Sequence, residues 1–298
     1  MPLTHFKVGG ELIPVKDAMG GALSFKYPGA YLRAVAGERQ LEEKPGSKLH
    51  VTQLLRGTRE NYLRMLVDYA EDPDGGAFLV VGSSAHVLLA NHAGKMDEAE
   101  KAFPDEDVAG TLDMLEEDGT LIDYKTWGSY AVVKALGIVK EGKGKDAVYH
   151  RNPDRADLKD LSLQMNRYRM YAEKAGLEVK RLKCFVVVRD GGLQIARTRG
   201  VDQKTYYMGV PFVDDEKVDE YFDRKKKELL EHLVKRSVLA DSEGITSEEA
   251  TAGGIPPMCT DKECWDGAKC KGGYCPVAKE CAFVGSNPYL EDTQLSEF

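Results

Sequence analysis

In the stretch "GTLDMLEEDGTLIDYKTW" (110–127), three charged residues lie outside the central "EEDG": Asp113, Asp123 and Lys125. In an extended strand, residues two apart share a face, so Asp123 and Lys125 project together. The letters "EEDG" supply turn residues between two strand-like runs and predict a hairpin over 107–127, in which Asp113 reaches the same side. We expect this face to be open, because unpaired charge is costly to bury.

Two interpretations of this face follow from the residues alone. Carboxylates are the ligands that hard divalent cations prefer, and an ammonium group can stabilise charge on a bound phosphate. A cross-strand ion pair on a solvated face explains the same residues without any function. Both interpretations remain open at this level.

Charge is concentrated in one part of the chain. Residues 91–119 carry a net charge of −8, which equals the net charge of the whole protein. Such a stretch is either a solvated acidic turn or part of a cation site, and Glu100 within it is a possible extra acid. The overall charge does not fit a protein that coats nucleic acid by charge alone.

The cysteines are distributed unevenly. Cys184 stands alone in the apolar run "CFVVV", where it is expected to be a small buried hydrophobe. The other five lie between positions 259 and 281: Cys259, Cys264, Cys270, Cys275 and Cys281. In a large chain with no signal peptide, this spacing favours a metal or an iron–sulfur cluster over disulfides.

The periodicity predicts four helices and at least four strands, two of them in the hairpin. The expected helices are 51–70 with Thr52 as N-cap, 83–94 from Ser83 to Gly94, 154–175, and 216–238. Beyond the hairpin, strands are expected at 177–188 and, once or twice, within 194–213.

Composition divides the chain into four segments. These are an irregular N-terminal segment with short strands (1–48), a core (49–240), a linker (241–257) and a cysteine-rich segment with a tail (258–298). With no apolar run of membrane length and no leader pattern at the N-terminus, we expect a cytoplasmic protein.

Four short motifs, in order along the chain, resemble those of the RecB-like branch of the PD-(D/E)XK nuclease superfamily. They are "GSSAH" with His86, "GTLD" with Asp113, "DYK" with Asp123 and Lys125, and "QMNRY" with Gln164 and Tyr168. The resemblance implies an α/β, restriction-endonuclease-like core: a mixed central sheet flanked by helices, followed by a cysteine-rich metal-binding segment.

The resemblance also implies roles for these residues. His86, Asp113 and Asp123 would hold Mg²⁺ or Mn²⁺, with a backbone carbonyl near Tyr124 as a further ligand. Lys125 would position the attacking water or stabilise charge on the phosphate.

Gln164 and Tyr168 are one helical turn apart and share a face. The resemblance makes them catalytic-site residues that brace the site or contact the DNA backbone. Spacing alone fits an ordinary core aromatic at position 168 equally well. The net-basic segment 134–151 is placed to hold phosphates, or is simply solvated.

The cysteine segment is similar to those of iron–sulfur exonucleases of the AddB and CRISPR-associated RecB type. "CKGGYCPVAKEC" matches their closing triplet, Cys270, Cys275 and Cys281, but Gly57 stands where their first cysteine is expected. The fourth ligand must then come from nearby. We expect Cys259, with Cys264 as the spare, to complete a [4Fe–4S] site, or alternatively a Zn²⁺ site.

The expected function is that of a divalent-metal-dependent DNA exonuclease, phage or bacterial, in recombination, repair or CRISPR adaptation. Its partners would be DNA and proteins of those processes. One alternative is a non-catalytic DNA-binding protein on the same fold with a structural cysteine–metal site. Another is an interaction protein that carries an acidic hairpin and a zinc module.

Overall fold

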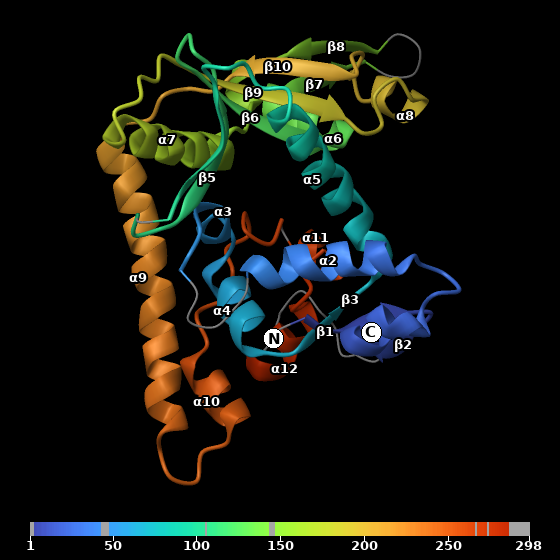
Figure 1. Ribbon diagram of the computed structural model, residues 1–298. Helices are drawn as coiled ribbons and strands as arrows, with labels where there is room; N and C mark the ends of the chain where they lie inside the picture. The colour runs from blue at the N-terminus through green and yellow to red at the C-terminus, as the bar shows by residue number, and fades with distance from the viewer. Residues whose placement is uncertain are drawn as a thin grey trace. The chain divides into compact units, whose positions relative to one another are not determined.

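The structure is a computed structural model that describes residues 3–42, 48–104, 106–142, 147–265, 267–272 and 274–285. Part of the basic loop (143–146) and the tail from 286 onward lie outside the described residues. The chain forms an α/β protein with mixed sheets flanked by helices (Figure 1). It divides into two compact units: Met1–Val80 with Glu220–Phe298, and Val81–Asp219.

The Val81–Asp219 unit is built on a five-stranded sheet. Its strands lie in the order β10-β9-β6-β5-β4. Their bounds are β4 Glu98–Phe103, β5 Gly110–Leu115, β6 Thr120–Trp127, β9 Arg181–Val188 and β10 Thr205–Gly209. β6 and β9 are parallel, and the other neighbouring pairs are antiparallel. The predicted hairpin is confirmed as β5 and β6, with Gly119 at φ 82° in its turn.

Helices and a second hairpin complete this unit. They are α6 Ser129–Leu136, β7 Ile138–Glu141, β8 Val148–Arg151, α7 Lys159–Lys174 and α8 Gln194–Arg197, with α5 Ala77–Ala90 entering from the other unit. α7 packs against β5 and β6. It begins later than predicted because Pro153–Arg155 forms a separate 3₁₀ turn, and it ends before Gly176 at φ 82°. α8 occupies part of 194–213, where we expected strand, and β10 is the one strand described there.

The other unit has a three-stranded sheet in the order β2-β1-β3. Its elements are β1 Leu3–Val8, β2 Glu11–Pro14, α1 Val15–Asp17, α2 Gly29–Glu42, α3 Val51–Leu54, α4 Thr58–Leu66, β3 Tyr69–Glu71, α10 Ser247–Gly254, α11 Ala268–Lys271 and α12 Ala278–Gly285. α9 Asp215–Ala240 begins in the Val81–Asp219 unit and continues into this one. It confirms the helix predicted at 216–238. The core of the unit with the three-stranded sheet includes Phe6, Leu54, Leu63 and Leu229, all fully buried.

Three local predictions are corrected. The helix expected over 51–70 is wrong, because the chain turns at Gly57 and residue 69 begins a strand. Thr52 is not an N-cap, since α3 follows His50. α5 begins six residues before Ser83, which therefore caps nothing.

The segment predicted as a linker contains α10. Thr246 and Glu249 form a capping box there, in which each side chain accepts the other's backbone N–H. Among the helices that the structure describes, none combines the length and the apolar character that crossing a bilayer requires.

Candidate active site

The site forms where β5 and β6 separate. Their backbone pairing is limited to Met114 with Ile122 and Leu115 with Leu121. Beyond these positions, the Tyr124 N–H donates to Asp113 Oδ2 at 2.7 Å. A carboxylate thus takes the place of a strand carbonyl, which holds Asp113 in a fixed orientation between the two strands.

His86 on α5 approaches the same point. Its Nε2 lies 3.0 Å from the Tyr124 carbonyl oxygen, and its Nδ1 lies 3.4 Å from Asp113 Oδ1 and 3.6 Å from Glu100 Oε1. The hydrogen bond with Asp113 raises the pKa of His86, against the opposing effect of burial. His86 and Asp113, both expected as metal ligands, thus lie side by side, and the ring also contacts Tyr124 edge-on.

Asp123 is buried rather than open to solvent, with 3% of its surface exposed. Its carboxylate accepts from Lys125 Nζ at 2.9 and 2.8 Å and from Gln164 Nε2 at 3.1 Å. The open face that we predicted is wrong for Asp123, because α7 covers it. Cys184, its partner on β9, is fully buried as predicted and places its sulfur 4.0 Å from Asp123 Oδ2.

Burial raises the pKa of Asp123 to about 6, although the Lys125 charge opposes this rise. Burial alone would lower the pKa of the Lys125 ammonium, but Asp123 and Asp113 outweigh it and the pKa is raised. The lysine therefore stays protonated at neutral pH. It is a compact fixed cation beside two carboxylates.

The two α7 residues predicted for the site lie under it. Gln164 is 8% exposed and braces Asp123, as one of our interpretations required. Tyr168 is 5% exposed, and burial followed by the charges of Asp123 and Asp113 raises its pKa. Both side chains are thus placed to support the carboxylates from the protein interior.

Glu100, a possible extra acid from the sequence, lies at this site. One carboxylate oxygen of Glu100, one carboxylate oxygen of Asp113 and one ring nitrogen of His86 lie within 4.8 Å of one another. Glu100 has φ 48°, a left-handed conformation that non-glycine residues rarely adopt. The β4–β5 register places Glu100 opposite Asp113. That register is the signal by which Glu100 could have been assigned to the site.

The five clustered cysteines converge in the other unit. They line a cavity of about 20 Å³, together with Arg59 and Glu60 of α4. The five are Cys259, Cys264, Cys270, Cys275 and Cys281, all with free thiols. Cys264 donates its S–H to the Thr260 carbonyl at 3.1 Å, which occupies that thiol within its own turn.

Charged and polar groups surround these thiols. Arg59 is 4% exposed and donates to the Cys281 carbonyl at 3.0 Å. Burial raises the pKa of Cys259 to about 12 and also raises that of Cys281. A metal must displace these protons, and a buried guanidinium offsets part of the resulting thiolate charge.

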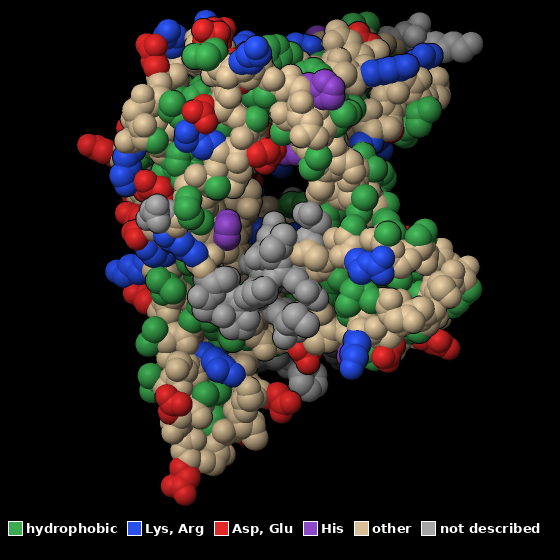
Figure 2. Space-filling model, in the orientation of Figure 1, with side chains coloured by type: hydrophobic (Ala, Val, Ile, Leu, Met, Phe, Trp, Pro, Cys, Tyr) green, Lys and Arg blue, Asp and Glu red, His purple; other side chains and the backbone are tan. Residues whose placement is uncertain are grey.

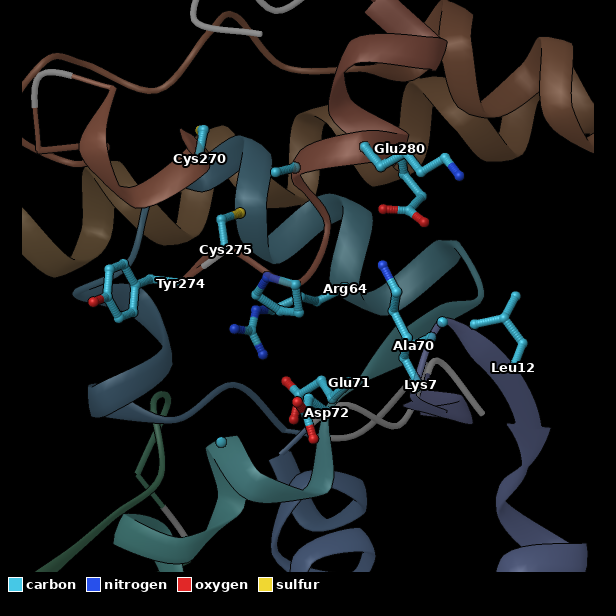
Figure 3. Close-up of a pocket in the computed structure, with 16 residues that line it drawn as sticks. Lys7, Leu12, Arg64, Ala70, Glu71, Asp72, Cys270, Tyr274, Cys275 and Glu280 are labelled. Carbon is cyan, nitrogen blue, oxygen red and sulfur yellow. The ribbon is translucent and has the colours of Figure 1, made fainter. Parts of the chain in front are cut away.

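A second, larger cavity of about 550 Å³ adjoins the cysteines. Cys270 and Cys275 line it with Arg64, Glu71 and Asp72 (Figure 3). The same two cysteines also line the smaller cavity. Among the described residues, the group of three ligand atoms that lies within 4.8 Å is His86, Glu100 and Asp113, so no three cysteine sulfurs are that close together. A tetrahedral Zn²⁺ site, with Zn–S distances of about 2.3 Å, would therefore require the thiols to move toward one another.

Comparisons with known proteins do not establish a family for this chain. No family model matches it, and no curated protein matches it. A solved structure described as the crystal structure of SSO0001 is similar with a TM-score of 0.36 and 12% identity. That match covers 66% of this chain and 83% of the other.

Proposed function

We propose that the protein is a divalent-metal-dependent deoxyribonuclease with a restriction-endonuclease-like core, acting as an exonuclease in recombination, repair or CRISPR adaptation. The observation that carries this proposal is the convergence of His86, Asp113 and the Asp123–Lys125 pair where β5 and β6 separate. Imidazole and carboxylate groups are suitable ligands for Mn²⁺, and carboxylates for Mg²⁺.

Each residue has a defined task in this proposal. A bound Mg²⁺ or Mn²⁺ would polarise a phosphate oxygen and lower the pKa of a coordinated water. Gln164 fixes the Asp123 carboxylate, and Asp123 holds the Lys125 ammonium at 2.8 Å. Lys125 then offsets the negative charge that develops on the phosphate during cleavage.

DNA binding would depend on local contacts rather than on overall charge. The chain carries a net charge of −8, and Figure 2 shows Lys and Arg interspersed with Asp and Glu on the face drawn. On the β7–β8 hairpin, Lys140 lies over the Tyr149 ring at 5.9 Å and Arg151 over Tyr206 at 5.9 Å. These cations are the ones we propose for phosphate contacts.

The cysteine segment would hold a structural metal centre through Cys259, Cys270, Cys275 and Cys281. A [4Fe–4S] cluster is the form that the family resemblance favours, and Zn²⁺ is the alternative. Either would cross-link a segment that has little core of its own. Iron, sulfide and zinc analysis of anaerobically purified protein separates these forms.

Digestion of labelled DNA tests the proposed activity. Linear duplex, circular duplex and single strands are incubated with the full chain in Mg²⁺, Mn²⁺ or EDTA. Metal-dependent loss of linear but not circular DNA supports an exonuclease. Binding without cleavage in any metal supports the alternative, a non-catalytic DNA-binding protein. If the protein neither binds nor cleaves DNA, the proposed link to nucleic acid is contradicted.

A further inference from the structure

Glu100 lies on β4, beside the strand β5 that carries Asp113, and faces the proposed metal site. In the β4–β5 ladder, Ala99 pairs with Met114 and Lys101 with Leu112, so Glu100 and Asp113 occupy the positions between these pairs. Residues opposite one another in an antiparallel pair project on the same side of the sheet. Both carboxylates therefore reach His86, at 3.6 Å and 3.4 Å from its Nδ1.

The hydrogen bond of His86 to Tyr124 determines which ring nitrogen is available. A backbone carbonyl only accepts, so Nε2, at 3.0 Å from the Tyr124 oxygen, carries the proton. In the neutral ring, Nδ1 then presents its lone pair to Glu100 and Asp113. Three electron-pair donors that face one another repel unless a cation lies between them or Nδ1 is also protonated.

We propose that Glu100 is a ligand of the catalytic metal and, with His86 Nδ1 and Asp113, forms a donor set that prefers Mn²⁺ to Mg²⁺. This inference rests on the proposed function, and it extends the ligand set expected from the sequence. The imidazole nitrogen is the reason for the preference, since Mg²⁺ favours oxygen ligands alone. The Asp123 carboxylate already binds Lys125 and Gln164. Glu100 can therefore supply the second carboxylate ligand of the metal.

Binding of Mn²⁺ to the full chain without DNA tests this ligand role. Titration followed by electron paramagnetic resonance gives the affinity for wild type, Glu100→Gln and Glu98→Gln. Glu98 is a matched control because it lies on the same strand with the same side-chain exposure of 42% and pairs with Lys101. We expect a loss of more than about tenfold for Glu100→Gln and none for Glu98→Gln.

A second variant, Glu100→Gly, distinguishes a ligand from a structural residue. Glycine adopts φ 48° without the steric cost that a side chain adds, so the metal-free variant should melt at or above the wild-type temperature. Its Mn²⁺ affinity should nevertheless fall as it does in Glu100→Gln. A lower melting temperature with unchanged Mn²⁺ affinity overturns the inference.

The outcomes separate this inference from the nuclease proposal. A wild type that binds Mn²⁺ and cuts DNA, with Glu100→Gln unaffected in affinity, overturns the role of Glu100 alone. Mn²⁺ binding that depends on Glu100, in a protein that cuts no nucleic acid, supports the ligand role and overturns the nuclease proposal. A wild type that binds no Mn²⁺ overturns the inference.

Discussion

Gly57 and Cys259 lie so close together that a β-carbon built on Gly57 would stand 2.5 Å from the Cys259 sulfur. The backbone at Gly57 has φ −59° and ψ 138°, which any residue can adopt. Space, rather than conformation, therefore requires glycine there. The Cys259 thiol occupies the position that a side chain at residue 57 would take.

This relationship predicts that the two positions can exchange the ligand role. Cys259→Ala should lose the metal, and the double variant Gly57→Cys with Cys259→Ala should regain it, because the new sulfur enters the same space. Metal content and the absorption spectrum after anaerobic purification provide the measurement.

Cys264→Ala is the control for this exchange. Its thiol donates to the Thr260 carbonyl, so the variant should keep its full metal content. Loss of metal in Cys264→Ala, with retention in Cys259→Ala, would make Cys264 the fourth ligand and contradict the pairing with Gly57.

Lys125→Met is expected to reduce DNA cleavage by at least about a hundredfold, because a fixed cation that stabilises transition-state charge is lost. The variant also leaves the buried Asp123 carboxylate without its cation, so the melting temperature is expected to fall and rates are compared below it. Rates on labelled linear DNA check this, with Lys101→Met as control, since Lys101 pairs with Glu98 on β4. Equal losses in both variants would remove the catalytic role of Lys125.

Tyr168→Phe is expected to slow turnover while the melting temperature stays within a few degrees of wild type. The hydroxyl is buried beside Asp123 and Gln164, whereas the ring supplies the packing that phenylalanine keeps. Single-turnover kinetics and calorimetry are the two measurements. A large drop in melting temperature with normal kinetics would assign Tyr168 to the core alone.

Asp190→Asn is expected to lower the free energy of unfolding by about 1 kcal/mol at pH 7. Asp190 accepts from the Ser129 N–H and hydroxyl, both at 2.6 Å, at the start of α6. Burial alone would raise the pKa of Asp190, but these bonds outweigh it and the pKa is lowered.

A lowered carboxyl pKa sets the sign of the pH dependence. The contribution of Asp190 is present above its unfolded pKa of about 3.9 and is lost as the pH falls through the lower folded value. Denaturant titrations of wild type and Asp190→Asn should therefore converge in strong acid. A stability gap that is constant from pH 7 to pH 2 would contradict the assignment.

The amino-acid sequence by itself determined the hairpin, the shared side of Asp123 and Lys125, and the separation of Cys184 from the five clustered cysteines. These features depend on residues close together in the chain, where strand alternation and turn residues act directly. The helices expected at 83–94, 154–175 and 216–238 were recognised as regions, with ends that differ from those of α5, α7 and α9. The helix expected over 51–70 was not, because the turn at Gly57 overrides the periodicity.

Only the tertiary structure decided the burial of Asp123, the orientation of the His86 ring, the approach of Glu100 and the contact between Gly57 and Cys259. Each joins residues from different strands or helices, so sequence spacing carries no information about the distance between them. Asp123 was expected to face solvent, but α7 covers it, so its carboxylate is buried and its pKa is raised. The chemistry of the candidate site therefore depends on packing that local sequence patterns do not encode.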